Sequence, residues 1–387
     1  MIIVVKILAI ESSCDETAAA IIAGEPVNST SSAPQAMPEL LSSVVVSQID
    51  IFKSYGGVIP EVAARSHLEA ILPVIHQAFV GAGLTKKSGN SSAPEDDWDQ
   101  IDAIAVTHTP GLLGSLLIGT LTARTLSILH DKPLYAIHHL KSHIYANWLP
   151  STDDKTIETS YDSTKAPEFP LLSLVVSGGH TQIIRMSEHN NFEIIGTTLD
   201  DAVGECYDKI AKILGLPYPG GPSIAAAAKN GNPDKYKLPI PQIKDLDFSF
   251  SGLKTAVLRA VQKEVNVPIS YPSYKLAELL STQQKADFAA SFQKTATKIL
   301  LDKLAKALSQ YPDTRSIVIA GGVSANEDLR NTALARFSNK TKVFFPALKF
   351  AGDNAAMVGV AAFYEIASGI KPTDPYKLNI MPRSEIC

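Results

Sequence analysis

Short apolar runs alternate with longer amphipathic stretches along this chain. Apolar, β-branched runs that end at glycine or polar residues are typical of buried strands, whereas apolar residues repeated three and four positions apart are typical of helices. We therefore expect strands at residues 6–10, 103–107, 171–176, 183–186, 317–320 and 342–345, and helices at residues 61–80, 113–130, 202–214, 285–310, 327–336 and 354–368. This alternation predicts a layered α/β architecture.

Three stretches rich in serine, proline and charge interrupt the pattern. They offer few side chains to a core, so loops are predicted at residues 24–43, 86–99 and 150–169.

Two segments share one plan and suggest an internal repeat. In residues 6–22 and again in residues 173–186, an apolar strand enters a tight polar turn and a second strand leaves it. The small and hydroxyl residues of such turns leave backbone N–H groups free, and two facing turns could cradle phosphates. The repeat predicts two similar lobes around a cleft.

The composition fits a folded protein of about two domains. The chain has 387 residues, of which 45% are hydrophobic and 19% charged, so a sizeable core can form and global disorder is excluded. The formal net charge of -4 means that nucleic-acid binding would need a local basic patch. The three cysteines, Cys14, Cys206 and Cys387, are too few for a disulfide framework or a cysteine-rich zinc site. No apolar run reaches the roughly 18 residues of a membrane span, so no membrane association is expected.

The sequence HHLKSH places two histidines four residues apart. On a helix, His139 and His143 would share a face and could bind one metal ion, while His138 would point elsewhere. Histidine pairs at this spacing also arise by chance. Leu140 stands where a zinc-protease signature has glutamate, which argues against peptidase chemistry.

Two glycine pairs follow apolar strands, at Gly178–Gly179 and at Gly321–Gly322. Glycines at the carboxyl end of a strand let the backbone approach a ligand, as in nucleotide-binding α/β sheets. A tight hairpin turn is the plainer explanation for the first pair. Asn326, after the second pair, is expected to cap a helix.

Two acidic residues lie in or directly before predicted helices. Asp208 lies two turns into a predicted helix and could accept from a ribose hydroxyl, although a helix followed by a PGGP turn at 219–222 is the plainer interpretation. Asp353 precedes another helix, where a lone aspartate usually serves as a cap. Spacing alone does not connect Asp353 to the histidines.

Taken together, these segments resemble the universal tRNA N6-threonylcarbamoyladenosine synthesis proteins, once described as O-sialoglycoprotein endopeptidases. The resemblance covers nearly the whole chain and is specific because many motifs occur in the same order: LAIESSCDETAAA, YGGVIPEVAARSH, PGLLGSLLIG, HHLKSH, VVSGGHTQ, DDAVGECYDKIAKILGLPYPGG, DFSFSGLKTA, AGGVSAN and GDNAAM.

The resemblance implies an actin-like ATPase fold of the sugar kinase and Hsp70 type, with two ribonuclease-H-like lobes around a nucleotide cleft. The expected N-terminal lobe comprises residues 1–132, completed by a C-terminal helix within about 353–387, and the expected C-terminal lobe comprises residues 133–352.

The resemblance also implies a site. One divalent metal ion per subunit, with iron or zinc favoured, would be held by His139, His143 and Asp353. The adenylate would contact residues carried over from three motifs: Val175, Val176, Ser177, Gly178, Gly179, Asp208, Gly221 and Asn326.

The implied reaction transfers a threonylcarbamoyl group from threonylcarbamoyl-AMP to N6 of adenosine 37 in tRNAs that read ANN codons, and AMP leaves. No general base is evident; Glu11 and Asp15, in the first turn, are the candidates, and hydrogen bonding within the turn is their alternative role. A small-molecule kinase of the same fold, a metalloprotease and a scaffold that only binds remain as alternatives.

Two departures from the family pattern suggest a branch and a location. Val175 and His180 group the chain with bacterial and organellar members. The Ser/Pro-rich insertions favour a mitochondrial protein, whose presequence would lie outside this sequence, with the bacterial cytoplasm as the alternative. In the organellar branch we expect a homodimer that receives threonylcarbamoyl-AMP from a separate synthase.

Overall fold

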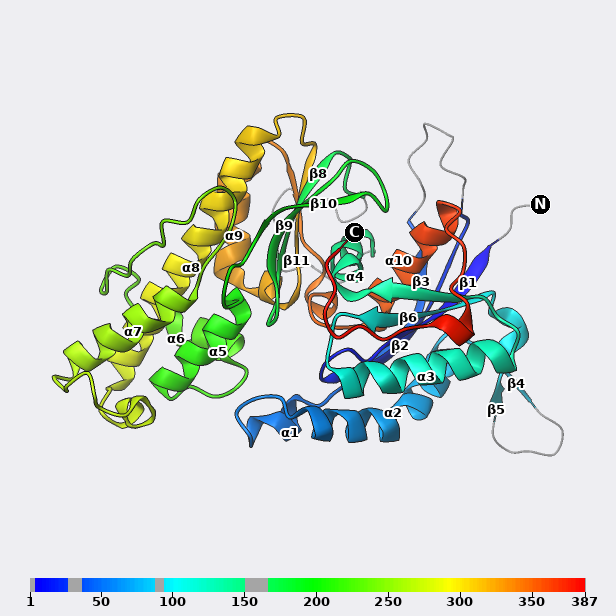
Figure 1. The fold of residues 1–387 in the computed structure, drawn as a ribbon, viewed down its shortest axis with the longest axis horizontal. Coiled ribbons are helices and arrows are strands. Elements are labelled where there is room, and N and C mark those ends of the chain that lie inside the picture. The colour runs from blue at the N-terminus through cyan, green and yellow to red at the C-terminus, as the bar shows by residue number, and fades with distance from the viewer. Residues whose placement is uncertain (1–3, 27–36, 88–93, 150–165, 387) are drawn as a thin grey trace.

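A computed structural model of the protein describes residues 4–26, 37–87, 94–149 and 166–386. The chain forms two lobes that lie side by side (Figure 1), each built on a five-stranded sheet. Among the helices in these ranges, none is both long and apolar enough to cross a membrane.

The first sheet has the strand order β3-β2-β1-β6-β7. β1 pairs antiparallel with β2, and β2 with β3, whereas β6 and β7 run parallel to β1. The central strands are buried along most of their length, which explains their nearly continuous apolar sequences. The strands are β1 (Val5–Glu11), β2 (Glu16–Gly24), β3 (Glu39–Ser47), β6 (Ala103–Thr109) and β7 (Leu134–His138).

The second sheet repeats this order as β10-β9-β8-β11-β12, with the same senses. The two antiparallel pairs β1–β2 and β8–β9 are the repeated segments expected from the sequence, so the internal repeat is confirmed. The strands are β8 (Leu171–Val176), β9 (Thr181–Met186), β10 (Phe192–Thr197), β11 (Ser316–Ala320) and β12 (Lys342–Phe344).

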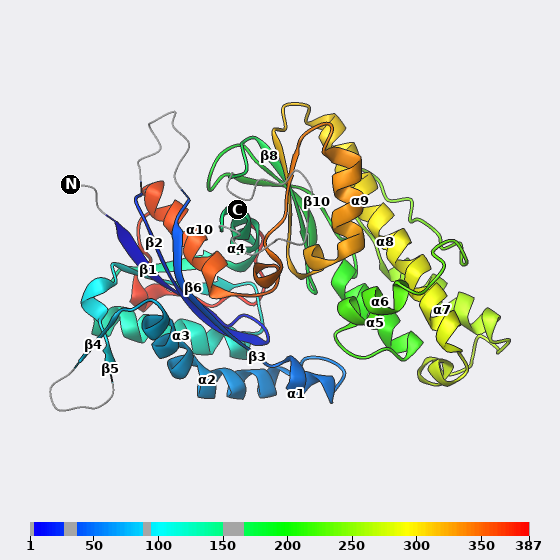
Figure 2. The ribbon, with the colours of Figure 1, turned by 180° about the vertical axis from the view of Figure 1, so that it is seen from behind.

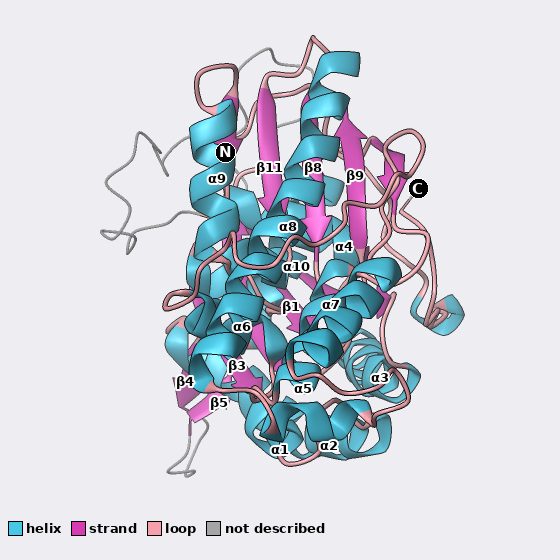
Figure 3. Ribbon diagram, turned by 90° about the vertical axis from the view of Figure 1, so that its left-hand side faces the viewer, coloured by secondary structure: helices cyan, strands magenta, loops and turns pink. Residues whose placement is uncertain are grey.

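Helices cover both sheets and fill the space between them. On the outer face of the first sheet lie α2 and α3 (Figure 2), and α5 to α9 belong to the second lobe (Figure 3). The helices are α1 (Ile49–Lys53), α2 (Pro60–Gly81), α3 (Leu113–Leu129), α4 (His139–Tyr145), α5 (Val203–Leu214), α6 (Gly220–Ala228), α7 (Ser251–Glu264), α8 (Thr282–Gln310), α9 (Glu327–Phe337) and α10 (Ala355–Ala367).

A single apolar core joins the lobes. It contains side chains from both sheets, such as Ile7 and Ile137 of the first and Val175 and Val318 of the second, and it is completed by α4 and α10. These two helices therefore form a layer that both sheets share, and the interface between the lobes is part of the hydrophobic core.

Every expected strand and helix is present, but β7, β10, α6 and α7 were not expected, and two predicted loops contain strands. β3 begins inside the segment 24–43, and the short hairpin of β4 (Thr85–Lys87) and β5 (Pro94–Asp96) occupies part of 86–99. β3 is an edge strand with many exposed side chains, so its sequence tolerates serines and lacks a clear apolar pattern. In the third predicted loop, residues 150–165 lie outside the described residues.

The lobe boundary expected between residues 132 and 133 falls one strand too early. β7 hydrogen-bonds to β6 and belongs to the first sheet, although the sequence-based division assigned it to the second lobe. We propose that the division follows β7. The C-terminal helix α10 packs against β1 and β2, as a helix that completes the first lobe would do.

Candidate functional site

Two histidines and one aspartate converge within the shared helical layer of α4 and α10. The helix α4 places His139 and His143 one turn apart on one face, and Asp353 precedes Asn354, the N-cap residue of α10. Asp353 Oδ1 lies 3.4 Å from His139 Nε2 and 3.1 Å from His143 Nε2. One ligand atom from each residue lies within 4.8 Å of the others, so the group could hold one metal ion.

Glu11 orients His139 from behind. Its Oε2 lies 3.1 Å from His139 Nδ1 and also accepts a 2.6 Å hydrogen bond from Thr107 Oγ1, while its Oε1 accepts from the backbone N–H of Ser13 at 2.5 Å. These groups meet because β1 and β6 run parallel and end at the same edge of the sheet. With Nδ1–H donating to the carboxylate, the lone pair of Nε2 is directed at the cluster, as in carboxylate–histidine–metal arrangements.

The charges around the cluster favour a cation. Burial opposes ionisation of His139, but Asp353 and Glu11 outweigh it and hold the pKa of His139 well above its usual value. Burial likewise opposes the charge of Asp353, and His139 and His143 overcome it and lower the pKa of that carboxyl. Among the described residues, buried His143 Nδ1 has no hydrogen-bond partner.

The donor set fits a divalent transition-metal ion. Two imidazole nitrogens with one carboxylate oxygen are ligands that zinc and iron accept, and three protein ligands leave a coordination position open for another molecule. The alternative role of Asp353, a helix cap, falls instead to Asn354, whose side chain accepts from the backbone N–H of Met357.

The turn between β1 and β2 carries the second candidate base, Asp15, and β2 begins with a further acid, Glu16. Burial, followed by the charges of Asp353 and Asp15, raises the pKa of Glu16 well above its usual value. The charge of Asp15 also reaches Asp208 and Tyr218 of the second lobe, although burial is the largest cause of the raised pKa of each. The charge of Asp15 therefore acts on groups of both lobes.

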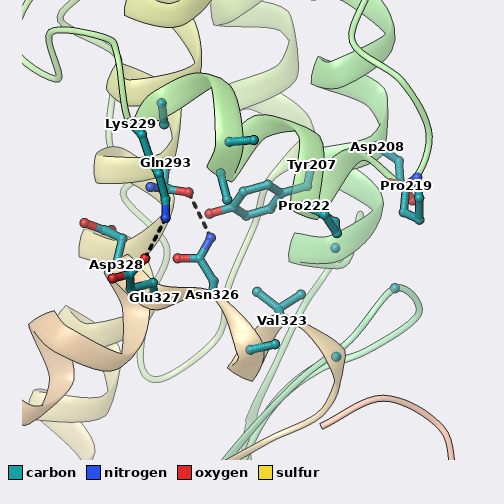
Figure 4. A pocket seen from close by; sticks show the side chains of 18 of the residues that line it. Tyr207, Asp208, Pro219, Pro222, Lys229, Gln293, Val323, Asn326, Glu327 and Asp328 are labelled. Atoms are coloured by element: carbon teal, nitrogen blue, oxygen red, sulfur yellow. Dashed lines mark hydrogen bonds and ion pairs between the residues drawn. The ribbon is translucent and has the colours of Figure 1, made fainter. Parts of the chain in front are cut away.

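A cleft of about 770 Å³ opens in the second lobe (Figure 4). Its lining unites Gly178, Asp208, Gly221 and Asn326, four residues from three separate sequence motifs. The other residues of the first glycine motif are not in this lining. Val175 and Val176 are buried in strand β8, and Ser177 and exposed Gly179 belong to the turn that follows it.

The two glycine turns are adjacent because their strands are. β8 and β11 are parallel neighbours in which Val175 pairs with Ala320, so Ser177–Gly179 and Gly321–Gly322 leave the same sheet edge. Gly321 has a φ of +89°, and a Cβ there would lie 2.4 Å from the carbonyl oxygen of Val176. Only glycine permits this approach.

Hydrogen bonds fix two polar residues of the cleft. Asp208 Oδ1 accepts from the backbone N–H of Gly220 at 2.7 Å, which joins α5 to the start of α6. Asn326 Oδ1 accepts from the backbone N–H of Leu329 at 3.1 Å, so its predicted capping role is confirmed, and its Nδ2 donates to Gln293 at 2.8 Å.

Several residues of the cleft were missed in the sequence. Pro222, Ala225 and Ala226 line it from α6, Lys229 lines it from the C-cap of that helix, and Tyr207 and Gln293 line it from α5 and α8. The α6 residues follow the spacing of one helix face, which was the available signal. That face is mostly alanine, however, and its sequence alone does not distinguish a cleft wall from a core contact.

Comparison with known proteins supplies the family. Residues 39–360 match the family described as tRNA N6-adenosine threonylcarbamoyltransferase (TsaD). The chain belongs to this family. The tRNA N6-adenosine threonylcarbamoyltransferase of Symbiobacterium thermophilum is 43% identical over 94% of this chain and 93% of its own length, and that of Christiangramia forsetii is 42% identical over 93% of each.

Solved structures confirm the fold expected for a TsaD-family member. The crystal structure of HypF from T. kodakarensis superposes with a TM-score of 0.55 at 11% identity, and covers 95% of this chain and 48% of that longer one. The protein thus has the predicted actin-like ATPase fold of the sugar kinase and Hsp70 type. Family membership makes it an acyltransferase and does not favour a small-molecule kinase or a metalloprotease. The relatives named here are bacterial, so they do not support the expected mitochondrial location.

Proposed function

We propose that this protein transfers the threonylcarbamoyl group of threonylcarbamoyl-AMP to N6 of adenosine 37 in tRNAs that read ANN codons, and releases AMP. The family match along nearly the full length of the chain carries this proposal. In the reaction, N6 attacks the acyl carbonyl carbon, the bond from that carbon to the phosphate oxygen breaks, AMP takes the electron pair, and N6 loses a proton.

The second-lobe cleft is the proposed adenylate site. Asp208 would accept from a ribose hydroxyl with the carboxylate oxygen that does not bind Gly220. The backbone of Ser177–Gly179, in the turn after Val175 and Val176 of β8, and that of Gly221 would face the phosphate, because open glycines allow a phosphate to approach N–H groups closely. Asn326, held by Gln293, would form part of the opposite wall. Fixed donors around the leaving phosphate stabilise charge that develops as AMP departs.

The metal proposed is one divalent ion, iron or zinc, held by His139, His143 and Asp353. When bound, such an ion supplies Lewis acidity that polarises a carbonyl oxygen. Glu11 holds His139 in the tautomer that presents Nε2 to the cluster. Since three protein donors already engage its carboxylate, we assign Glu11 to positioning, which leaves Asp15 as the candidate acceptor of the N6 proton.

The partners proposed are tRNA, a separate synthase that supplies threonylcarbamoyl-AMP, and a second copy of this chain. Exposed leucines support the homodimer: Leu68 and Leu72 lie on α2, and Leu117 and Leu121 on α3. The two helices approach closely because Gly114 of α3 lies against Ala64 of α2. A two-helix apolar face of this kind can pair with its own copy about a two-fold axis.

We place the protein with its bacterial relatives in a compartment that holds tRNA, so the bacterial cytoplasm replaces the mitochondrial matrix as the favoured location. No membrane partner is proposed.

The experiment is in vitro modification of tRNA. The purified protein is incubated with tRNA, threonine, bicarbonate, ATP and a threonylcarbamoyl-AMP synthase, and the nucleosides are analysed by mass spectrometry. We expect modified adenosine with the wild type and about a hundredfold less with His139→Ala. His76→Ala, which removes a partly exposed histidine paired with Asp96, is the matched control and should retain activity. Unmodified tRNA with the wild type would refute the transfer, and full activity of His139→Ala would refute the metal-assisted mechanism.

A further inference from the structure

A second cavity lies outside the adenylate cleft, between the two lobes. Its volume is about 610 Å³, and its walls come from three places in the chain: Pro110 and Gly111 after β6, His180 and Gln182 of the second lobe, and the C-terminal segment around Arg383. The function proposed above requires two substrates, and the adenylate cleft accounts for only one of them.

The C-terminal wall of this cavity is firmly attached to the first lobe. Thr109 Oγ1 donates to the carbonyl oxygen of Met381 at 2.6 Å, and the backbone N–H of Gly111 donates to that of Pro382 at 3.2 Å. Near the end of the chain, Ile386 is buried in the core between the lobes. These contacts hold the segment against the first lobe and the core between the lobes.

Gln182, which lines the cavity, has a buried side-chain oxygen without a hydrogen-bond partner in the described part of the chain. Its side chain is on β9 and only 8% of the residue is exposed, yet its Oε1 has no hydrogen-bond partner among the described residues. A buried amide oxygen without a partner costs free energy, so such a group calls for a ligand or an ordered water. In contrast, the side-chain oxygen and nitrogen of Asn326, in the adenylate cleft, both have partners.

His180, which lines this cavity, interacts electrostatically with the cluster of His139, His143 and Asp353. Burial, followed by the charges of His139 and His143, lowers the pKa of His180 to about 4, so its ring is neutral near pH 7 and lies within electrostatic reach of both ligands. Arg383 and Glu385 also line the cavity, and the exposed side chain of Arg383 adds a positive charge.

We infer that this cavity receives the acceptor adenine of the RNA, with Gln182 bound to the edge of the base and Arg383 to a flanking phosphate. This inference rests on the proposed function. A glutamine amide can accept from the N6 amino group of adenine and donate to N7. Acceptance of one N6 proton leaves the second proton to be removed and increases electron density at the attacking nitrogen. The guanidinium supplies a sequence-independent phosphate contact.

The test separates RNA binding from adenylate binding. The full-length protein is assayed with a synthase and an anticodon stem-loop RNA, and AMP binding is measured separately by calorimetry. We expect Gln182→Met, which removes the amide from a side chain of similar size, to lower kcat/KM for the RNA roughly 10- to 100-fold while the AMP affinity stays unchanged. Thermal unfolding of this variant, compared with the wild type, verifies its folding.

Arg383→Ala tests the phosphate contact at an exposed position where folding is not at risk. We expect weaker RNA binding and a slope of log K against log salt concentration that is smaller by about one. Lys371→Ala, which removes another exposed cation of the C-terminal segment outside the cavity, should leave the slope unchanged. Wild-type kinetics in Gln182→Met or a wild-type salt slope in Arg383→Ala would overturn the inference. Failure of the wild type to modify any RNA would instead refute the proposed function.

Discussion

At the scale of single residues, Glu11 acts on the site by orienting His139. Its carboxylate is fully buried, and Thr107, Ser13 and His139 surround it. Burial disfavours the charge, but His139 more than compensates and keeps the pKa of Glu11 below its usual value. The carboxylate therefore stays ionised and fixes the ring that offers Nε2 to a metal.

We predict that Glu11→Ala weakens metal binding by about 10- to 100-fold, because an outer carboxylate orients the ligand and increases its basicity. Affinity is measured by competition with a chromophoric chelator. Glu11→Gln keeps a hydrogen-bond acceptor and should lie between the wild type and Glu11→Ala. Glu69→Ala, at an exposed site on α2, is the control. Equal affinity in all four proteins would contradict the positioning role.

His189 gives the stability a pH dependence. Its ring stacks on Tyr364 with centroids 3.9 Å apart, and burial lowers its pKa to about 4. Because the folded pKa lies below that of an unfolded histidine, near 6.5, this group is neutral without penalty above about pH 6.5 and destabilises the fold as the pH falls toward 4. At pH 5 the penalty is about 2 kcal/mol.

We predict that His189→Phe, which retains the stacking, removes this penalty. The free energy of unfolding, measured with denaturant at about pH 7.5 and about pH 5, should fall by about 2 kcal/mol less in the variant than in the wild type. Variant and wild type with the same pH dependence would show that His189 does not carry this effect.

At the scale of elements, the sequence predicts many of the strands and helices, but it does not predict which of them meet at the site. The apolar runs predict β1, β6, β8 and β11 because these strands are buried on both faces. Edge strand β3 is mostly exposed and was taken for a loop. Helical spacing predicts the histidine pair of α4, but Asp353 reaches it only through tertiary packing of α10 against α4. Only the family resemblance connected these segments.

The junction of α5 and α6 depends on one glycine. A Cβ at Gly220 would lie 2.5 Å from the Cα of Asp208. We predict that Gly220→Ala forces α6 away from α5, weakens AMP binding at least about tenfold and lowers the thermal midpoint, since backbone cannot yield as a side chain does.

Gly252→Ala is the matched control, because a Cβ at Gly252 meets nothing within 4 Å and its φ is ordinary. That control should bind AMP normally and be equally or slightly more stable. Normal AMP affinity in Gly220→Ala would refute the argument.

At the scale of the whole molecule, one strand order occurs twice, and a shared helical layer joins the copies. The strand-turn-strand repeat in the sequence predicted this duplication. The cleft and the second cavity were not predictable as volumes, because their walls come from segments far apart in the chain. The α2–α3 face was also missed, because an exposed leucine and a core leucine look alike in sequence.

We predict that Leu117→Lys separates the proposed dimer, because a charge at the centre of an apolar interface must be desolvated without a partner. Light scattering should change from twice 41.4 kDa to 41.4 kDa. Leu348→Lys, at an exposed leucine away from α2 and α3, should leave the mass unchanged. A monomeric wild type would contradict the dimer.

The wide separation of His143 and Asp353 in the sequence affects the entropy of the unfolded chain. His143 and Asp353 are separated by about 210 residues, a span that includes the whole second sheet. An ion bound to both would act as a reversible cross-link that closes this long loop, and the unfolded chain could not reproduce it without a large loss of entropy. The free concentration of the ion would then set how much its binding stabilises the association of the two lobes. The cell could therefore change the folding stability of this protein through its supply of metal.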